Sequence, residues 1–211
     1  MLISYILINM LTHNTYILAS SSRSRYNILK NSGFNFIQVK PKCNEEEIKN
    51  KIKSNRSTTI KPSNLAKILS LEKALSVSKN SKYYDFNVIG CDTLIHLDNK
   101  IFDKAKSIKE AKMKIKLLSG KTHKIVSGLT ICKRGVKIWQ CSVTTSVKIK
   151  KLKSPQINMY LKKTGKQILD SVGCYQIESL GPNIIEDIRG DFFNVMGLPL
   201  FKLLKQTSAK E

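Results

Sequence analysis

The sequence lacks a long apolar segment, which argues against an ordinary membrane-spanning helix. Its most apolar stretch, residues 1–11, is about half as long as a bilayer requires, and it does not open with the Lys or Arg of a secretory signal. The organised pattern of strands and helices begins only at Tyr16. We therefore treat residues 1–15 as an N-terminal extension, with Met10 as an alternative start.

Cysteine is sparse, and the sequence has no C-x-x-C pair. The cysteines are odd in number and widely spaced, so they indicate neither a disulfide framework nor a zinc site. They are Cys43, Cys91, Cys132, Cys141 and Cys174. Free thiols are typical of a reducing compartment, and we expect a cytoplasmic location.

Acidic residues are scarce relative to basic ones. The chain has 15 Asp and Glu against 37 Lys and Arg, which gives a net charge of +22. Such a balance favours a polyanionic partner, but the lysines are spread along the chain together with many Ile and Asn residues. We interpret the charge as a general positive field that favours phosphorylated ligands, and only as weak evidence for nucleic-acid binding.

Several common catalytic motifs are missing. The three histidines form no H-E-x-x-H pattern, and the chain has no G-x-S-x-G sequence, so zinc-peptidase and acyl-hydrolase chemistry are not indicated. The SGKT sequence at 119–122 resembles a phosphate-binding loop, but Ile115 stands where that loop needs a glycine. A helix end at Gly120 is the better interpretation.

Strands and helices alternate without a strict βαβ rhythm, which predicts an α/β fold around a mixed sheet. A polar stretch at 44–64 predicts a loop or an exposed helix, and Ser107 with Glu110 predicts a capping box. Residues 98–99 and 134–135 predict tight turns between paired strands. The expected strands are 16–19, 34–39, 87–97, 124–132 and 136–149, and the expected helices are 22–33, 65–77, 107–118, 154–165 and a final amphipathic segment.

The stretch LASSSRSRYNIL at 18–29 has two interpretations. In the first, Ser21 or Ser22 caps a helix that stops at Gly33, and the two arginines are solvated. In the second, backbone N–H groups at the helix start, hydroxyl groups and guanidinium groups together form a phosphate site. The stretch alone does not decide between them.

Asp92 is a carboxylate within an otherwise apolar predicted strand, GCDTLI. A buried charge is costly unless it is paired or binds a metal, so Lys73 and Lys104 are candidate partners. The alternative is that Asp92 only caps a turn or accepts backbone N–H hydrogen bonds. The glutamates at 45–47 are hard oxygen ligands suited to Mg²⁺, although such a run is also typical of a solvated helix start.

Seven short motifs in order resemble the Maf family, the septum-formation-inhibitor-like nucleoside triphosphate pyrophosphatases. The resemblance extends from about Tyr16 to Leu204, and the ESLG sequence ending at Gly181 is similar to the subgroup of 7-methyl-GTP pyrophosphatases. The motifs are LASSSRSR at 18–25, NE at 44–45, EKA at 72–74, GCDT at 90–93, DKA at 103–105, LSGKTH at 118–123, and GCYQIESLG followed by GDFFNVMGLPL within 173–200.

This resemblance implies a Maf/ITPase-like α/β fold, with an elongated mixed β-sheet flanked by helices and two lobes around a central nucleotide cleft. It implies one domain over residues 16–205, followed by a tail at 206–211. The implied partner is a nucleoside triphosphate. No membrane partner is expected, and nucleic acid is not favoured as a partner. The sequence is compatible with a homodimer and leaves the oligomeric state open.

The resemblance also implies residue roles and a divalent cofactor, Mg²⁺ or Mn²⁺. Asp92 matches the proton acceptor, and it shares the metal-side acidic positions with Glu45. The implied catalytic residues are Asp92, Lys73 and Lys104. The implied substrate-binding residues are Ser22 and Arg25 for phosphate, and Ser24, Thr93 and Glu178 for the base.

Four departures from the family pattern bear on this site. Asn44 replaces an acidic residue beside the metal position, and Ala105 replaces a proline next to Lys104. Tyr26 replaces an arginine, and Arg23 stands at a position that the pattern leaves free. The alternative hypothesis is a basic nucleic-acid-binding or cell-division regulatory module whose catalysis is weakened by these changes.

Overall fold

The computed structural model describes residues 16–54, 60–98 and 100–208. The predicted extension at 1–15, including both candidate start residues, lies outside the described residues, as does the second residue of the predicted turn at 98–99. No helix in the described part of the chain is long and apolar enough to cross a membrane.

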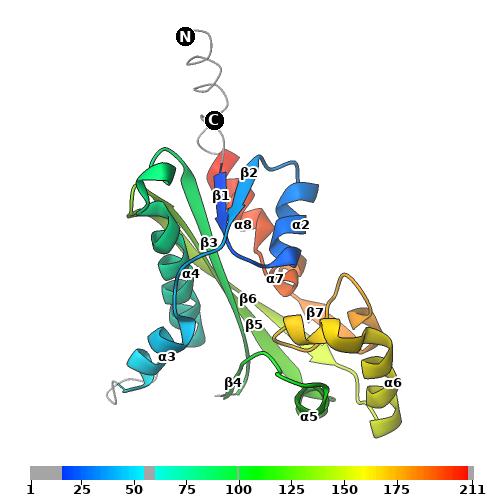
Figure 1. Cartoon of the computed structure of the whole chain (residues 1–211). Helices are drawn as coiled ribbons and strands as arrows, with labels where there is room; N and C mark the ends of the chain where they lie inside the picture. The colour runs from blue at the N-terminus through cyan, green and yellow to red at the C-terminus, as the bar shows by residue number, and fades with distance from the viewer. Residues whose placement is uncertain (1–15, 55–59, 99, 209–211) are drawn as a thin grey trace. The chain divides into compact units, whose positions relative to one another are not determined.

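A single mixed sheet organises the described chain, with helices packed against it (Figure 1). The strand order is β2-β1-β3-β5-β6-β7, and β4 pairs with β3. Strand β1 is parallel to both β2 and β3, whereas β4 and β7 are antiparallel to their partners. The strands are β1 (Tyr16–Ala19), β2 (Phe36–Val39), β3 (Asn87–Leu97), β4 (Lys100–Phe102), β5 (Thr122–Lys133), β6 (Val136–Ile149) and β7 (Ile185–Arg189).

The helices confirm most of the sequence-based expectations. They are α2 (Arg23–Asn31), α3 (Glu45–Ser54), α4 (Pro62–Ser78), α5 (Ile108–Leu118), α6 (Ser154–Thr164), α7 (Phe192–Met196) and α8 (Leu200–Ser208), with short 3₁₀ turns η1 (Ser81–Tyr83), η2 (Gly165–Asp170) and η3 (Gly181–Asn183). Part of the polar stretch is therefore an exposed helix, α3. The predicted tail at 206–211 begins inside α8, which continues to Ser208.

Two local predictions need correction. At α5, the Ser107 hydroxyl accepts the Glu110 N–H at 3.2 Å, but the Glu110 carboxylate bonds the N–H of Lys106 at 2.7 Å rather than that of Ser107. The capping box is therefore shifted by one residue. Strand β7 was not expected, because it forms only by pairing with distant β6.

The chain divides into two compact units, and β3, β5 and β6 contribute residues to both. The first unit comprises the described residues up to Asp92, then Ser127–Ser142 and the chain from Gly197 onward. The second comprises Thr93–Val126 and Val143–Met196. The first unit has an apolar cluster around Ile17, Val77 and Val88, and the second has a larger one around Ile115, Ile149 and Tyr175.

Two glycines allow α4 to lie directly on the sheet in the first unit. A Cβ at Gly90 of β3 would collide with the Ser70 carbonyl, and a Cβ at Gly128 of β5 would collide with the Ala66 carbonyl. Gly90 thus serves close packing of the helix against the sheet. This close approach brings α4 side chains next to β3.

Candidate active site

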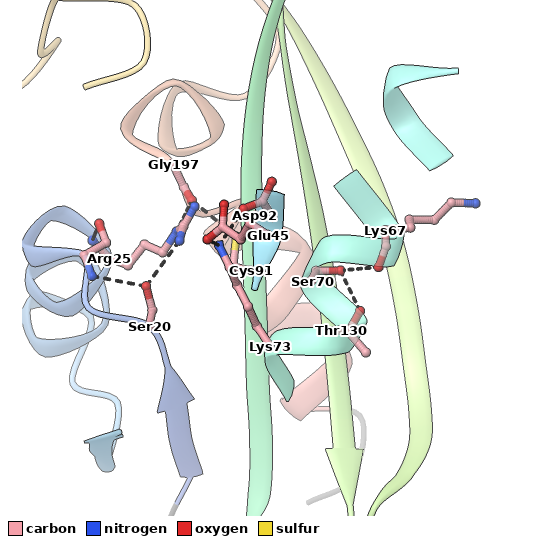
Figure 2. A network of polar contacts seen from close by, with 11 residues as sticks. Ser20, Arg25, Glu45, Lys67, Ser70, Lys73, Cys91, Asp92, Thr130 and Gly197 are labelled. Carbon is pink, nitrogen blue, oxygen red and sulfur yellow. Dashed lines mark hydrogen bonds and ion pairs between the residues drawn. The ribbon is translucent and has the colours of Figure 1, made fainter. Parts of the chain in front are cut away.

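A buried ion pair between Lys73 of α4 and Asp92 of β3 forms the centre of the candidate site (Figure 2). Lys73 Nζ lies 2.5 Å from Asp92 Oδ1, and both side chains are 7% exposed. The same Nζ lies 2.8 Å from Glu45 Oε1, at the start of α3. One ammonium group therefore bridges two carboxylates from different elements, which confirms that Lys73 is a partner of Asp92.

The sheet register explains why these residues meet. Ala19 at the end of β1 pairs with both Val39 of β2 and Gly90 of β3. The parallel strands β1 and β2 therefore end level with Gly90, two residues before Asp92. The segments that follow β1 and β2 leave the sheet there, at the carboxyl ends of the parallel strands. These segments lead into α2 and α3, which carry Arg25 and Glu45.

The carboxylates keep Lys73 charged despite its burial. Burial alone would lower the pKa of Lys73, but the attraction of Asp92, supplemented by Glu45, holds that pKa above its ordinary value. Partial burial would raise the pKa of Glu45, but the Lys73 ammonium outweighs it and lowers that pKa. Arg25 is close enough to act electrostatically on both groups. Lys73 and Glu45 therefore keep their charges at neutral pH.

Arg25 is the second buried cation of the first unit, with an exposed fraction of 9%. Its Nε donates to the Gly197 carbonyl at 2.8 Å, and its Nη1 donates to the Ser20 hydroxyl at 3.2 Å (Figure 2). Arg23, by contrast, is exposed. The helix thus turns one arginine inward and the other outward, which agrees with the choice of Arg25 from the sequence.

The serine turn confirms the capping interpretation of the sequence. Ser22 is the N-cap of α2, and its hydroxyl accepts the Arg25 N–H at 3.4 Å. The Ser20 hydroxyl accepts the Ser22 N–H at 3.2 Å, and Gln38 of β2 donates to the Ser20 carbonyl at 2.8 Å. Ser24 is half-buried. A capped helix start and a phosphate site are compatible, so the phosphate role of Ser22 stays a prediction.

Asn44, the departure beside Glu45, has a structural role. Its side-chain oxygen accepts the Glu47 N–H at 3.1 Å, and its carbonyl accepts the N–H of Ile48. Asn44 therefore caps α3 and is itself exposed. Because asparagine caps helices as well as aspartate does, this replacement preserves the position of Glu45.

The other predicted residues belong to the second unit. Thr93 follows Asp92 on β3 and is half-buried, whereas Lys104 and Glu178 are exposed. The Lys114 ammonium fastens the Lys104 loop by donating to the Asp103 carbonyl, and at 3.1 Å to the Val172 carbonyl. The roles of Thr93, Lys104 and Glu178 stay predictions.

Ser20 and Gly197 are site residues that the sequence reasoning did not single out. Ser20 directly follows buried β1 and is itself 3% exposed, so its place at the end of an apolar run was a usable signal. The part played by the Gly197 carbonyl had no such signal, because it lies 172 residues from Arg25.

The described residues do not provide an all-protein metal site. Among residues 16–54, 60–98 and 100–208, no three His, Cys, Asp or Glu side chains gather closely enough to hold an ion. The two carboxylates of Glu45 and Asp92 remain the predicted metal-side positions.

Comparisons with known proteins identify the family to which this chain is similar. The family model described as Maf-like protein matches residues 15–209. A 7-methyl-GTP pyrophosphatase of Bartonella quintana is 40% identical over 191 residues, covering 90% of this chain and 93% of that protein. A nucleoside triphosphate pyrophosphatase of Caulobacter vibrioides is 34% identical over 187 residues, covering 89% and 91%. These matches do not favour the nucleic-acid-binding alternative.

Proposed function

Since this chain belongs to the Maf-like protein family, we propose that it is a nucleoside triphosphate pyrophosphatase. The observation that carries this proposal is the buried ionic cluster of the first unit, in which Lys73 bridges Asp92 and Glu45 near Arg25. The names of the similar proteins, nucleoside triphosphate pyrophosphatase and 7-methyl-GTP pyrophosphatase, support the same reaction class.

The reaction is hydrolysis of the anhydride bond between the α and β phosphates. One water molecule is consumed, and the products are a nucleoside monophosphate and pyrophosphate. Asp92 accepts a proton from the attacking water. Alternatively, Asp92 would help to hold a divalent metal ion, which would make that water easier to deprotonate. Arg25, Lys73 and Lys104 stabilise the negative charge that builds up on the leaving pyrophosphate.

The donor set fits a divalent metal ion that arrives with the nucleotide. Two carboxylates, Glu45 and Asp92, face the same Lys73 ammonium, and Mg²⁺ is commonly held by one or two carboxylates together with substrate phosphates and water. When bound, Mg²⁺ or Mn²⁺ would neutralise phosphate charge. The two carboxylates would hold it, and Lys73 would contribute its positive charge at the same place.

Base selection and location complete the proposal. The half-buried Ser24 and Thr93 and the exposed Glu178 are the candidates for contacts with the base, and 7-methylguanine is the first base to test. A cytoplasmic location is consistent with the five free thiols of the chain.

A nucleotide panel with product identification tests this function. The protein is incubated with Mn²⁺ or Mg²⁺ and GTP, 7-methyl-GTP, dTTP, UTP and CTP, and the products are resolved by ³¹P NMR. We expect pyrophosphate and monophosphate from at least one of these nucleotides. Formation of only orthophosphate and the nucleoside diphosphate would contradict the assignment.

A further inference from the structure

We propose that the backbone carbonyl of Gly197 is a positioning group that holds Arg25 in its active orientation and ties it to the strand that carries Asp92. The kinetic test of this inference rests on the proposed function. The binding of an inorganic phosphate chain gives a second test that does not depend on that function. Gly197 begins the GLPL segment near the end of the chain, which the proposed mechanism does not otherwise use.

The Gly197 carbonyl accepts hydrogen bonds from two sides of the candidate site. Arg25 Nε of α2 donates to it at 2.8 Å, and the Cys91 thiol of β3 donates to it at 3.3 Å. Cys91 is fully buried and directly precedes Asp92. One oxygen atom therefore accepts hydrogen bonds both from the arginine and from the residue that precedes the proposed catalytic Asp92, as Figure 2 shows.

The second bond of Arg25 fixes the plane of its guanidinium group. Nη1 donates to the Ser20 hydroxyl at 3.2 Å, while Nε is engaged by Gly197. A planar group held at two of its nitrogens cannot turn about the Cδ–Nε bond without breaking one of these two hydrogen bonds. Arginine binds phosphate through a directional fork, so a fixed plane favours productive contacts.

The direction of this carbonyl depends on a glycine. Gly197 has a φ of +105°, a conformation that residues with a side chain rarely adopt. Its neighbour Leu198 is fully buried and Leu200 is 5% exposed, so the segment is held in place on the C-terminal side. A side chain at 197 would therefore strain the turn and rotate the carbonyl away from Arg25 and Cys91.

Gly197→Ala, Arg25→Ala and the double variant, each in the full chain, test this inference as a cycle. The matched control is Gly33→Ala, because Gly33 also has a positive φ, of +74°, follows the far end of α2 and has open space around its Cβ position. Both kcat and KM are measured for pyrophosphate release, together with calorimetric binding of inorganic tripolyphosphate and thermal unfolding.

We expect Gly197→Ala to lower kcat/KM by about 10- to 100-fold, as a misplaced catalytic group does, and Gly33→Ala to change it by about twofold at most. In the Arg25→Ala background, Gly197→Ala should add about a twofold effect at most, because the group it positions is gone. Full activity of Gly197→Ala, or an additive loss in the double variant, would overturn the proposal.

Ser20→Ala provides the test if Gly197→Ala does not fold. It removes the other hydrogen-bond partner of the guanidinium group. We expect Ser20→Ala and Arg25→Ala each to weaken tripolyphosphate binding, and the double variant to bind no more weakly than Arg25→Ala alone. Unchanged binding would refute the positioning of Arg25. If the wild-type chain hydrolyses no nucleotide, the proposed function fails, and the tripolyphosphate measurements still decide this inference.

Discussion

Two buried lysines, one in each unit, differ in what surrounds them. Lys73 in the first unit faces the carboxylates of Asp92 and Glu45, and its pKa lies above the ordinary value. Lys114 in the second unit donates to two backbone carbonyls, and burial lowers its pKa. As whole residues they are 6% and 9% exposed, so the opposite charge of the carboxylates, and not the depth of burial, sets the direction of the pKa shift.

A similar contrast is found at a buried polar pair of the second unit, His123 and Tyr175. His123 Nε2 lies 2.6 Å from the Tyr175 hydroxyl, and burial, with a contribution from His96, lowers the pKa of His123 to about 4. Burial also raises the pKa of Tyr175. The His123–Tyr175 pair of the second unit is thus buried in its neutral form, whereas Lys73 of the first unit is buried with its charge. Charge retained in a buried place is typical of a functional site.

Removing the Lys73 charge should have the largest effect. Lys73→Met leaves the Asp92 carboxylate buried without its cation, so we expect the free energy of unfolding to fall by about 3 kcal/mol and pyrophosphate release to fall by about 100-fold. Urea unfolding and steady-state kinetics measure the two effects. Lys114→Met is the matched control, with an expected loss of about 1–2 kcal/mol from its hydrogen bonds. Equal losses in the two variants would contradict the contrast.

Lowering the pH should weaken the chain through His123. Its pKa is about 4 in the folded state and 6.5 when unfolded, so the unfolded state binds the additional proton between these values. The contribution of His123 to the free energy of unfolding should be constant above pH 6.5. Below pH 6.5 it should fall by about 1.4 kcal/mol per pH unit as the pH drops towards 4. Comparing unfolding at pH 6.5 and pH 5 for the wild type and His123→Gln isolates this slope, and an unchanged slope in His123→Gln would refute it.

Removing the neutral pair should affect stability alone. Tyr175→Phe deletes the hydroxyl that contacts His123, and we expect a loss of about 1 kcal/mol with kcat/KM within about twofold of the wild type. Thermal unfolding and the pyrophosphate assay check both parts. A large loss of activity would place the second unit's pair in the catalytic machinery.

The smallest effect is expected at Arg23, which α2 turns outward. Arg23→Ala should change the free energy of unfolding by at most about 0.5 kcal/mol and kcat/KM by about twofold at most. A loss of activity in Arg23→Ala as large as that in Arg25→Ala would show that the difference in exposure does not distinguish the roles of the two arginines.

Much of the fold could be predicted from local patterns. The strand at 16–19, the strand at 87–97 and the hairpin between β5 and β6 follow from apolar periodicity and turn residues. Strand β7 could not be predicted because its pairing with β6 is distant in sequence. Arg25 shares the buried face of α2 with Ile28 and Leu29 at helical spacing, so its burial could be inferred. The Gly197 carbonyl could not, because backbone direction at a remote turn leaves no residue pattern.

Asp92→Asn tests the central claim most directly, because it replaces the buried carboxylate by an amide of the same shape. Pyrophosphate release from the best nucleotide of the panel is measured for the wild type, Asp92→Asn and Tyr175→Phe in parallel. We predict that Asp92→Asn lowers kcat by about 100-fold or more while Tyr175→Phe retains activity. Pyrophosphate release by Asp92→Asn at the wild-type rate would contradict the account.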